Sequence, residues 1–149
     1  MTSYLIDTNV WLAMTWDRHP HHLAASRWFE SADVAAFLFC RLTMLGFLRL
    51  LTNAKVMGGS TATLSEALAL YDQWRQDPRV ELLFEPRGIE DQFRQAAAPF
   101  LPQSAPKAVA DCYLVGIAAT SSAQLVTFNR GLANSARRCK VPVTLLPAA

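Results

Sequence analysis

The stretch Tyr4-Leu5-Ile6-Asp7-Thr8-Asn9, near the start of the chain, decides the fold. Its first three residues are apolar with no polar residue between them, which is typical of a strand buried on both faces of a parallel sheet. The run ends on Asp7, and the Thr and Asn that follow favour turns and helix starts. Ligands bind at the carboxyl ends of strands in open α/β sheets. Asp7 is therefore a candidate site residue, and its carboxylate needs a cation or a set of donors opposite it.

Length and composition predict one globular domain spanning residues 1–149. The chain is 52% hydrophobic, which is enough for a sizeable core. We find neither a secretory signal nor a membrane-spanning segment, so we expect a cytoplasmic protein. Three widely spaced cysteines, Cys40, Cys112 and Cys139, argue against both a disulfide framework and a zinc site.

The charge is unevenly distributed, although the formal net charge is only +2. No acid follows Asp111, whereas Arg130, Arg137, Arg138 and Lys140 lie in that part of the chain. A basic surface of this kind can follow a phosphate backbone, or it can simply keep a helix face solvated. Composition favours neither interpretation over the other.

The pattern along the chain alternates between apolar runs and amphipathic segments. Strands are expected at residues 4–6, 34–39, 80–84, 124–128 and 143–146, and helices at 10–15, 20–32, 41–53, 64–76, 89–100, 107–121 and 130–139. Two of these helices are expected to bury one face each, formed by Leu23, Ala24, Trp28 and Phe29 and by Leu64, Leu68, Tyr71 and Trp74. Such alternation predicts a three-layer α/β/α domain around a largely parallel sheet of four to five strands, with right-handed crossovers.

Asp111 is the second carboxylate that needs an explanation. It lies in Ala108-Val109-Ala110-Asp111-Cys112-Tyr113, a helix whose other residues are apolar or small. One explanation is a weak ion pair with Lys107, one turn earlier. The other is that Asp111 faces Asp7 at the edge of the sheet, where two like charges are tolerable around a shared proton or a bound cation. Spacing alone leaves both open.

A third polar residue favours the cation. Leu125-Val126-Thr127-Phe128-Asn129 repeats the layout of the first stretch, an apolar strand followed by a short polar side chain. If the two strands are adjacent, oxygens of Asp7, Asp111 and Asn129 converge on one point. Hard oxygen ligands suit Mg²⁺ or Mn²⁺, and such an ion can activate water and neutralise charge on a phosphoryl oxygen. Hydrolysis of a phosphodiester is the chemistry that this site predicts.

Three histidines, His19, His21 and His22, form a possible metal-binding cluster. Adjacent histidines diverge on a helix, however, and no acid or cysteine stands at ligand spacing from them. We therefore interpret them as the polar start of a helix that Pro20 opens.

The motifs together resemble those of the PIN-domain ribonucleases, and most closely the VapC-like toxins of type II toxin-antitoxin modules. The resemblance rests on Leu5 to Asn9, Gly46 to Asn53, Ala110-Asp111 and Leu125 to Arg130, in this order along the chain. It implies a small α/β/α domain, an endoribonuclease that depends on Mg²⁺, a homodimer, and a VapB-like antitoxin whose C-terminal segment lies near the active site. Transfer and ribosomal RNA are the substrates that the family suggests.

Two positions depart from the usual acids of that family. Gly46 stands where many members carry Glu, and Asn129 replaces an Asp, which leaves Asp7 and Asp111 as the acids of the site. Fewer ligand charges predict weaker metal binding. The alternatives are therefore a weakened PIN-fold protein that binds RNA or antitoxin without turnover, and a receiver-like domain that uses Asp7 as a nucleophile.

Four further residues have expected supporting roles. Asn9 and Thr127 are expected to orient Asp7 or a bound water, although Asn9 could instead cap a helix. Arg49 and Arg130 are candidates for holding RNA phosphates, with plain surface solvation as the alternative.

Overall fold

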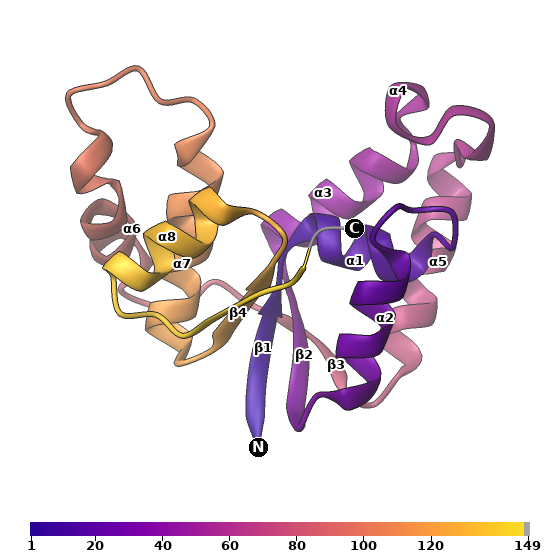
Figure 1. Ribbon diagram of the computed structural model, residues 1–149, viewed down its shortest axis with the longest axis horizontal. Coiled ribbons are helices and arrows are strands. Elements are labelled where there is room, and N and C mark those ends of the chain that lie inside the picture. The colour runs from indigo at the N-terminus through magenta and orange to yellow at the C-terminus, as the bar shows by residue number, and fades with distance from the viewer. Residues whose placement is uncertain (148–149) are drawn as a thin grey trace.

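The computed structural model describes residues 1–147 and contains one five-stranded sheet in the order β3-β2-β1-β4-β5 (Figure 1). All neighbouring strands are parallel. The strands are β1 (Thr2–Ile6), β2 (Val34–Cys40), β3 (Val80–Leu83), β4 (Gln124–Thr127) and β5 (Val143–Leu145). This confirms the predicted α/β architecture, with the sheet fully parallel.

Strand β1 lies in the middle of the sheet and pairs with both β2 and β4. The chain builds outward from β1 through β2 to β3, and then crosses to the other side of β1 to add β4 and β5. Ile6 is in register with Val126, and the Asp7 N–H donates to the Val126 carbonyl at 2.9 Å. The carboxyl ends of β1 and β4 therefore meet at the point where the strand order reverses, the usual binding position in such sheets.

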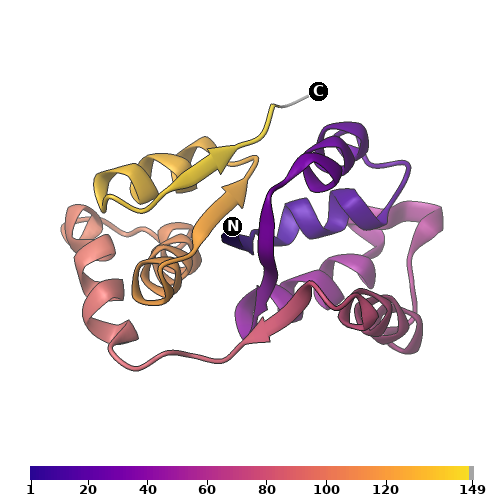
Figure 2. The same cartoon turned by 90° about the horizontal axis from the view of Figure 1, so that it is seen from below.

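Helices cover both faces of the sheet (Figures 1 and 2). One face carries α1 (Thr8–Thr15), α2 (His22–Ser31), α3 (Arg41–Leu51), α4 (Ala54–Met57) and α5 (Leu64–Gln76), and the other carries α6 (Ile89–Ala97), α7 (Ala108–Ser121) and α8 (Arg130–Arg138). Short 3₁₀ turns occupy Gly58–Ser60 and Ala98–Phe100. No helix within residues 1–147 has the length and apolar character needed to span a membrane.

The alternation of side chains along β1 divides the core into two layers. Tyr4 and Ile6 pack with the first group of helices, whereas Leu5 packs with the second. In the first layer Trp11 stacks on Phe39 with ring centroids 3.8 Å apart. Parallel strands buried on both faces need apolar residues at every position, which explains the uninterrupted run Tyr4-Leu5-Ile6.

Several helix predictions need correction. Helix α2 begins at His22, so Pro20 lies in the preceding turn and does not open the helix. Leu23 is 58% exposed and Leu64 60%, whereas Ala25 and Ala67 on the same helices are fully buried in the core. Leu68, 39% exposed, is likewise outside the core. Short α4 was not predicted, since four residues carry no periodicity.

Candidate active site

Asp7 is fixed by two hydrogen bonds at the end of β1. It is the N-cap of α1, and its Oδ1 accepts from the Thr8 N–H at 2.8 Å. Its Oδ2 accepts from the Thr127 hydroxyl at 2.7 Å. Burial raises the pKa of Asp7, and these two hydrogen bonds oppose that rise. Because Asp7 itself caps α1, the expectation that Asn9 might cap this helix is wrong.

Thr127 connects the ends of β4 and β1. Its side chain is fully buried, and its hydroxyl donates to Asp7 while accepting from the Asn129 backbone N–H at 2.9 Å. A hydroxyl has one proton to donate, so the carboxylate of Asp7 determines its direction. The Thr127 side chain thus contacts Asp7 directly, which is compatible with its predicted role of orienting that carboxylate.

Asp111 lies in the first turn of α7, on the opposite side of the sheet edge from α1. Burial, and then the charge of Asp7, raise the pKa of Asp111 to about 6. The second cause requires the two carboxylates to lie within electrostatic reach of each other. No ion pair joins Asp111 to Lys107 within the described chain. The charge of Asp7 thus acts on Asp111, and joint binding of a cation by the two carboxylates stays a prediction.

Asn129 lines the same cleft as Asp7, but its amide oxygen already has a partner. It is the N-cap of α8, and Oδ1 accepts from the Leu132 N–H at 3.2 Å. An amide oxygen has two lone pairs, so one remains for a second interaction. Ligation of a metal by Asn129 stays a prediction.

Gly46 on α3 lies against the Thr8 side chain. A Cβ there would lie 2.9 Å from Thr8 Oγ1 and 3.0 Å from Thr8 Cγ2, so a larger side chain fits only if the Thr8 side chain or its surroundings move. Residues 1–147 contain no group of three or more His, Cys, Asp or Glu side chains arranged to hold a metal. The acidic part of the site consists of Asp7 and Asp111.

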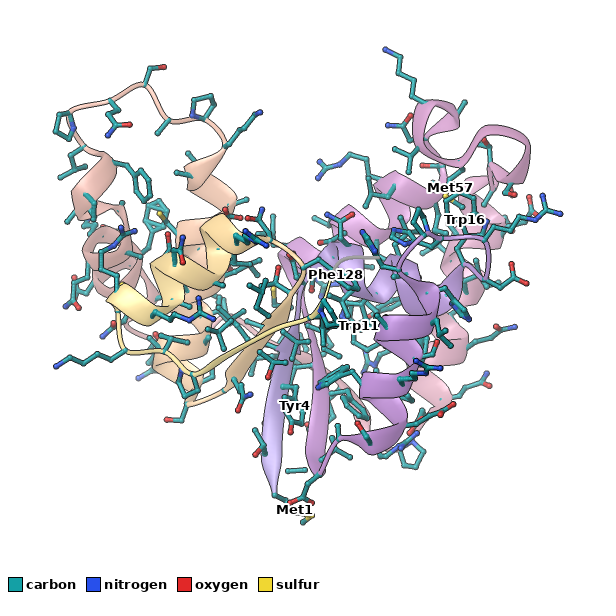
Figure 3. The ribbon with its side chains drawn as sticks, in the orientation of Figure 1. Met1, Tyr4, Trp11, Trp16, Met57 and Phe128 are labelled. Carbon is teal, nitrogen blue, oxygen red and sulfur yellow. The ribbon has the colours of Figure 1, made fainter. Side chains whose placement is uncertain are left out.

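Two histidines line the cleft next to Asp7, which the sequence analysis missed. The cleft measures about 480 Å³ and is bordered by Asp7, Asn9, His19, Pro20, His21, Phe128 and Asn129. Figure 3 shows Phe128 beyond the end of β4, on the side of α1 and α2. Their position directly after α1, the helix that Asp7 caps, could have indicated that His19 and His21 lie near Asp7. The prediction that a helix starts at Pro20 worked against this, because it placed His21 on a helix and not on the loop at this edge.

Arg49 and Arg130 are both exposed and lie on elements that border the site. Arg49 is one turn after Gly46 on α3, and Arg130 directly follows Asn129 as the first residue of α8. Neither forms an ion pair among residues 1–147. Both guanidinium groups are thus available to an anion, and their role in binding phosphates stays a prediction.

The donor set fits a hard divalent cation. Two carboxylates with raised pKa values share one edge of the sheet with an amide oxygen, and oxygen-only sites of this kind suit Mg²⁺ or Mn²⁺. A cation would relieve the repulsion that raises the pKa of Asp111. No cysteine of residues 1–147 borders this cleft, although His19 and His21 place imidazole nitrogens in it beside the oxygen donors.

Comparison with known proteins agrees with this geometry. Residues 4–138 match the PIN domain family. Ribonuclease VapC41 of Mycobacterium tuberculosis is 41% identical over 128 residues, which cover 83% of this chain and 86% of that protein. Among solved structures, VapBC-1 from nontypeable Haemophilus influenzae has a TM-score of 0.68 at 15% identity and covers 97% of this chain and 98% of its own.

A second solved structure has the same fold. It is VapC20 of Mycobacterium tuberculosis, described as a toxin that cleaves the sarcin-ricin loop, with a TM-score of 0.67 at 14% identity, covering 97% of this chain and 99% of its own. The family match spans most of the sequence and includes β2, β3, β4 and all but the first two residues of β1. The chain therefore belongs to the PIN-domain family and is a relative of the VapC ribonucleases.

Proposed function

We propose that this protein is the toxin of a VapBC-type toxin-antitoxin pair and acts in the cytoplasm as an endoribonuclease dependent on Mg²⁺ or Mn²⁺. The observation that carries the proposal is that the charge of Asp7, buried at the end of β1, acts on the half-buried Asp111 in the first turn of α7. Two like charges at one desolvated edge are unfavourable unless they share a proton or bind a cation, and a cation is the solution that remains above the raised pKa of Asp111. The relationship to ribonuclease VapC41 supports RNA as the substrate.

Asp7 and Asp111 would hold the cation, with Asn129 as a third oxygen donor. When bound, a divalent cation supplies an activated water and neutralises charge on the phosphoryl oxygens. The chain's own contribution is orientation: the Thr8 N–H and the Thr127 hydroxyl hold one oxygen of Asp7 each, so that the carboxylate cannot rotate. Asn9 at the cleft mouth would orient a water, and Arg49 and Arg130 would hold neighbouring phosphates.

We further propose a VapB-like antitoxin and a second copy of this chain as partners. The solved relative VapBC-1 is a complex of that type. Exposed apolar side chains that a partner could cover include Leu45 on α3, 52% exposed, and Leu101, 75% exposed.

The proposal predicts RNA cleavage that requires both the metal and the two acids. Purified protein should cut transfer or ribosomal RNA in the presence of Mg²⁺ and should stop when EDTA is added. Asp7→Asn and Asp111→Asn should each lower the cleavage rate by at least about a hundredfold. Asp72→Asn, which changes an exposed carboxylate on α5, is the matched control and should cut like the wild type.

A second function is favoured by two observations at this site. Gly46 supplies no acid, and the Asn129 oxygen already caps α8, so the site has fewer charges than four acids would give. A protein that binds RNA or antitoxin without turnover would show RNA binding that survives EDTA, and no cleavage with either Mg²⁺ or Mn²⁺. That result would refute the nuclease proposal.

A further inference from the structure

The cleft beside Asp7 has an aromatic wall that the acids do not explain. His21 and Phe128 lie with ring centroids 4.7 Å apart and planes tilted by 33°. The His19 ring is 5.5 Å from that of His21, and Trp16 meets His19 edge-on at 6.1 Å. Four rings from two distant parts of the chain thus form a continuous row, and three of them, those of His19, His21 and Phe128, line the cleft with Asp7.

This wall is preformed by hydrogen bonds in the turn between α1 and α2. The His21 N–H donates to His19 Nδ1 at 3.0 Å, and the His22 Nδ1 lies 2.7 Å from the Ala13 carbonyl. The His19 N–H donates to the Trp16 carbonyl at 3.0 Å. These hydrogen bonds fix the turn and the His19 ring before any ligand arrives, which lowers the entropy lost on binding.

The chemistry of the cleft suits a flat, uncharged ring with polar edges. Partial burial, with the neighbouring His21 and His22, lowers the pKa of His19, which favours its neutral ring. Asn9 and Asn129 place amide groups at the same cleft. Its volume of about 480 Å³ lies within the usual range for small-molecule sites, roughly 300–1,000 Å³. Aromatic rings beside amide groups are the means by which proteins bind nucleobases that have left a helical stack.

We propose that this cleft binds one unpaired nucleobase of the RNA, next to the phosphate that is cut. The base packs against the His21 and Phe128 rings, and Asn9 contacts its polar edge. The inference rests on the proposed function for the position of the base next to the cut phosphate, whereas binding of a base in the cleft can be measured without cleavage. It narrows the substrate class to loops and single strands, since a base inside an A-form duplex cannot reach such a wall.

The first test uses cleavage of two RNA hairpins that differ at one position. One has a normal base next to the cleaved bond, and the other has an abasic sugar there. The wild type should cut the abasic hairpin at least about fivefold more slowly, in proportion to the stacking that is lost. His21→Ala and Phe128→Ala should slow cleavage of the normal hairpin to a similar extent and should no longer distinguish the two RNAs.

Conservative variants and a control separate stacking from folding. His21→Phe and Phe128→Tyr keep a ring and should retain most of the preference for the normal hairpin. Phe84→Ala removes a ring that is 74% exposed just after β3, outside this cleft, and should leave the preference unchanged. Affinity for Mg²⁺ should be the same in His21→Ala as in the wild type, because no metal ligand is altered.

A measurement without cleavage distinguishes failure of this inference from failure of the proposed function. An RNA carrying 2-aminopurine at the same position is titrated with protein in EDTA, and stacking should quench its fluorescence in the wild type but not in Phe128→Ala. Quenching without any cleavage in either Mg²⁺ or Mn²⁺ would overturn the nuclease proposal and support the nucleobase site. Equal cleavage of normal and abasic hairpins, with no quenching, would overturn the nucleobase site alone.

Discussion

Replacing Asp111 by Asn should stabilise the protein when no metal is present. Asp111 has an ordinary pKa of 3.8, which the fold raises to about 6 through burial and then through the charge of Asp7. The folded state therefore binds a proton more tightly than the unfolded state, and stability falls as the pH rises from about 4 to about 6. Above pH 6 the whole destabilisation is present, and Asp111→Asn removes it.

The magnitude follows from the two pKa values. At about 1.36 kcal/mol for each tenfold change, the interval from 3.8 to about 6 corresponds to about 3 kcal/mol. Asp111 is only half-buried, so solvent screening reduces this to roughly 1–2 kcal/mol. For a domain of this size the Tm of the variant should rise by about 3–6 °C at pH 7.5. At pH 5 roughly half of that gain should remain.

Thermal unfolding in EDTA and in Mg²⁺ measures this directly. Wild-type protein should be stabilised by Mg²⁺ at pH 7.5, because the cation binds the folded state only, whereas Asp111→Asn should respond little. Asp72→Asn, at an exposed position on α5, should match the wild type in both buffers. A lower Tm for Asp111→Asn in EDTA, or an undiminished response to Mg²⁺, would show that Asp111 does not face Asp7 across a cation site.

Three other substitutions test neighbouring parts of the site. Gly46→Ala should destabilise the protein by about 1–3 kcal/mol in denaturant unfolding, since the new Cβ would lie 2.9 Å from Thr8 Oγ1. Adding Thr8→Ala to the same chain should restore most of the lost stability. Thr127→Val keeps the shape but removes the hydroxyl that links Asp7 to the Asn129 N–H, so unfolding should become easier by about 1–3 kcal/mol and Mg²⁺ binding weaker by calorimetry. Asn129→Asp should tighten Mg²⁺ binding without loss of stability, because Asp caps helices as well as Asn does. Asn53→Asp, which changes the cap of α4, is its control, and equal Mg²⁺ affinities for the two variants would place Asn129 outside the metal site.

Much of the fold could be predicted because strands and helices alternate clearly. The run Tyr4-Leu5-Ile6 predicts a doubly buried central strand, and Thr63 with Glu66 forms the capping box that begins α5. Exposure along the helices was harder to predict. Leu23 and Leu64 are strongly apolar, yet both are exposed. On the same two helices the small residues Ala25 and Ala67 are buried instead, and hydrophobicity alone does not show which face of a helix packs inward.

The site was predictable where a polar residue interrupts an apolar pattern. Asp7 and Asp111 are each charged residues within an apolar stretch that is expected to be buried. Such an interruption can be recognised from the sequence alone. Two features depend instead on contacts between distant segments. The contact between Thr8 and Gly46 limits the space for a side chain at position 46, and the contact between His21 and Phe128 forms part of the aromatic wall. Neither contact follows from the periodicity of apolar residues along the chain.

We propose that Asp7 and Asp111 jointly hold a divalent cation. Anomalous scattering from crystals soaked in Mn²⁺ would locate that cation. We expect one strong peak in contact with carboxylate oxygens of both residues, and no peak there in crystals of Asp111→Asn. A peak that contacts neither carboxylate, or an unoccupied space between them at saturating Mn²⁺, would contradict it.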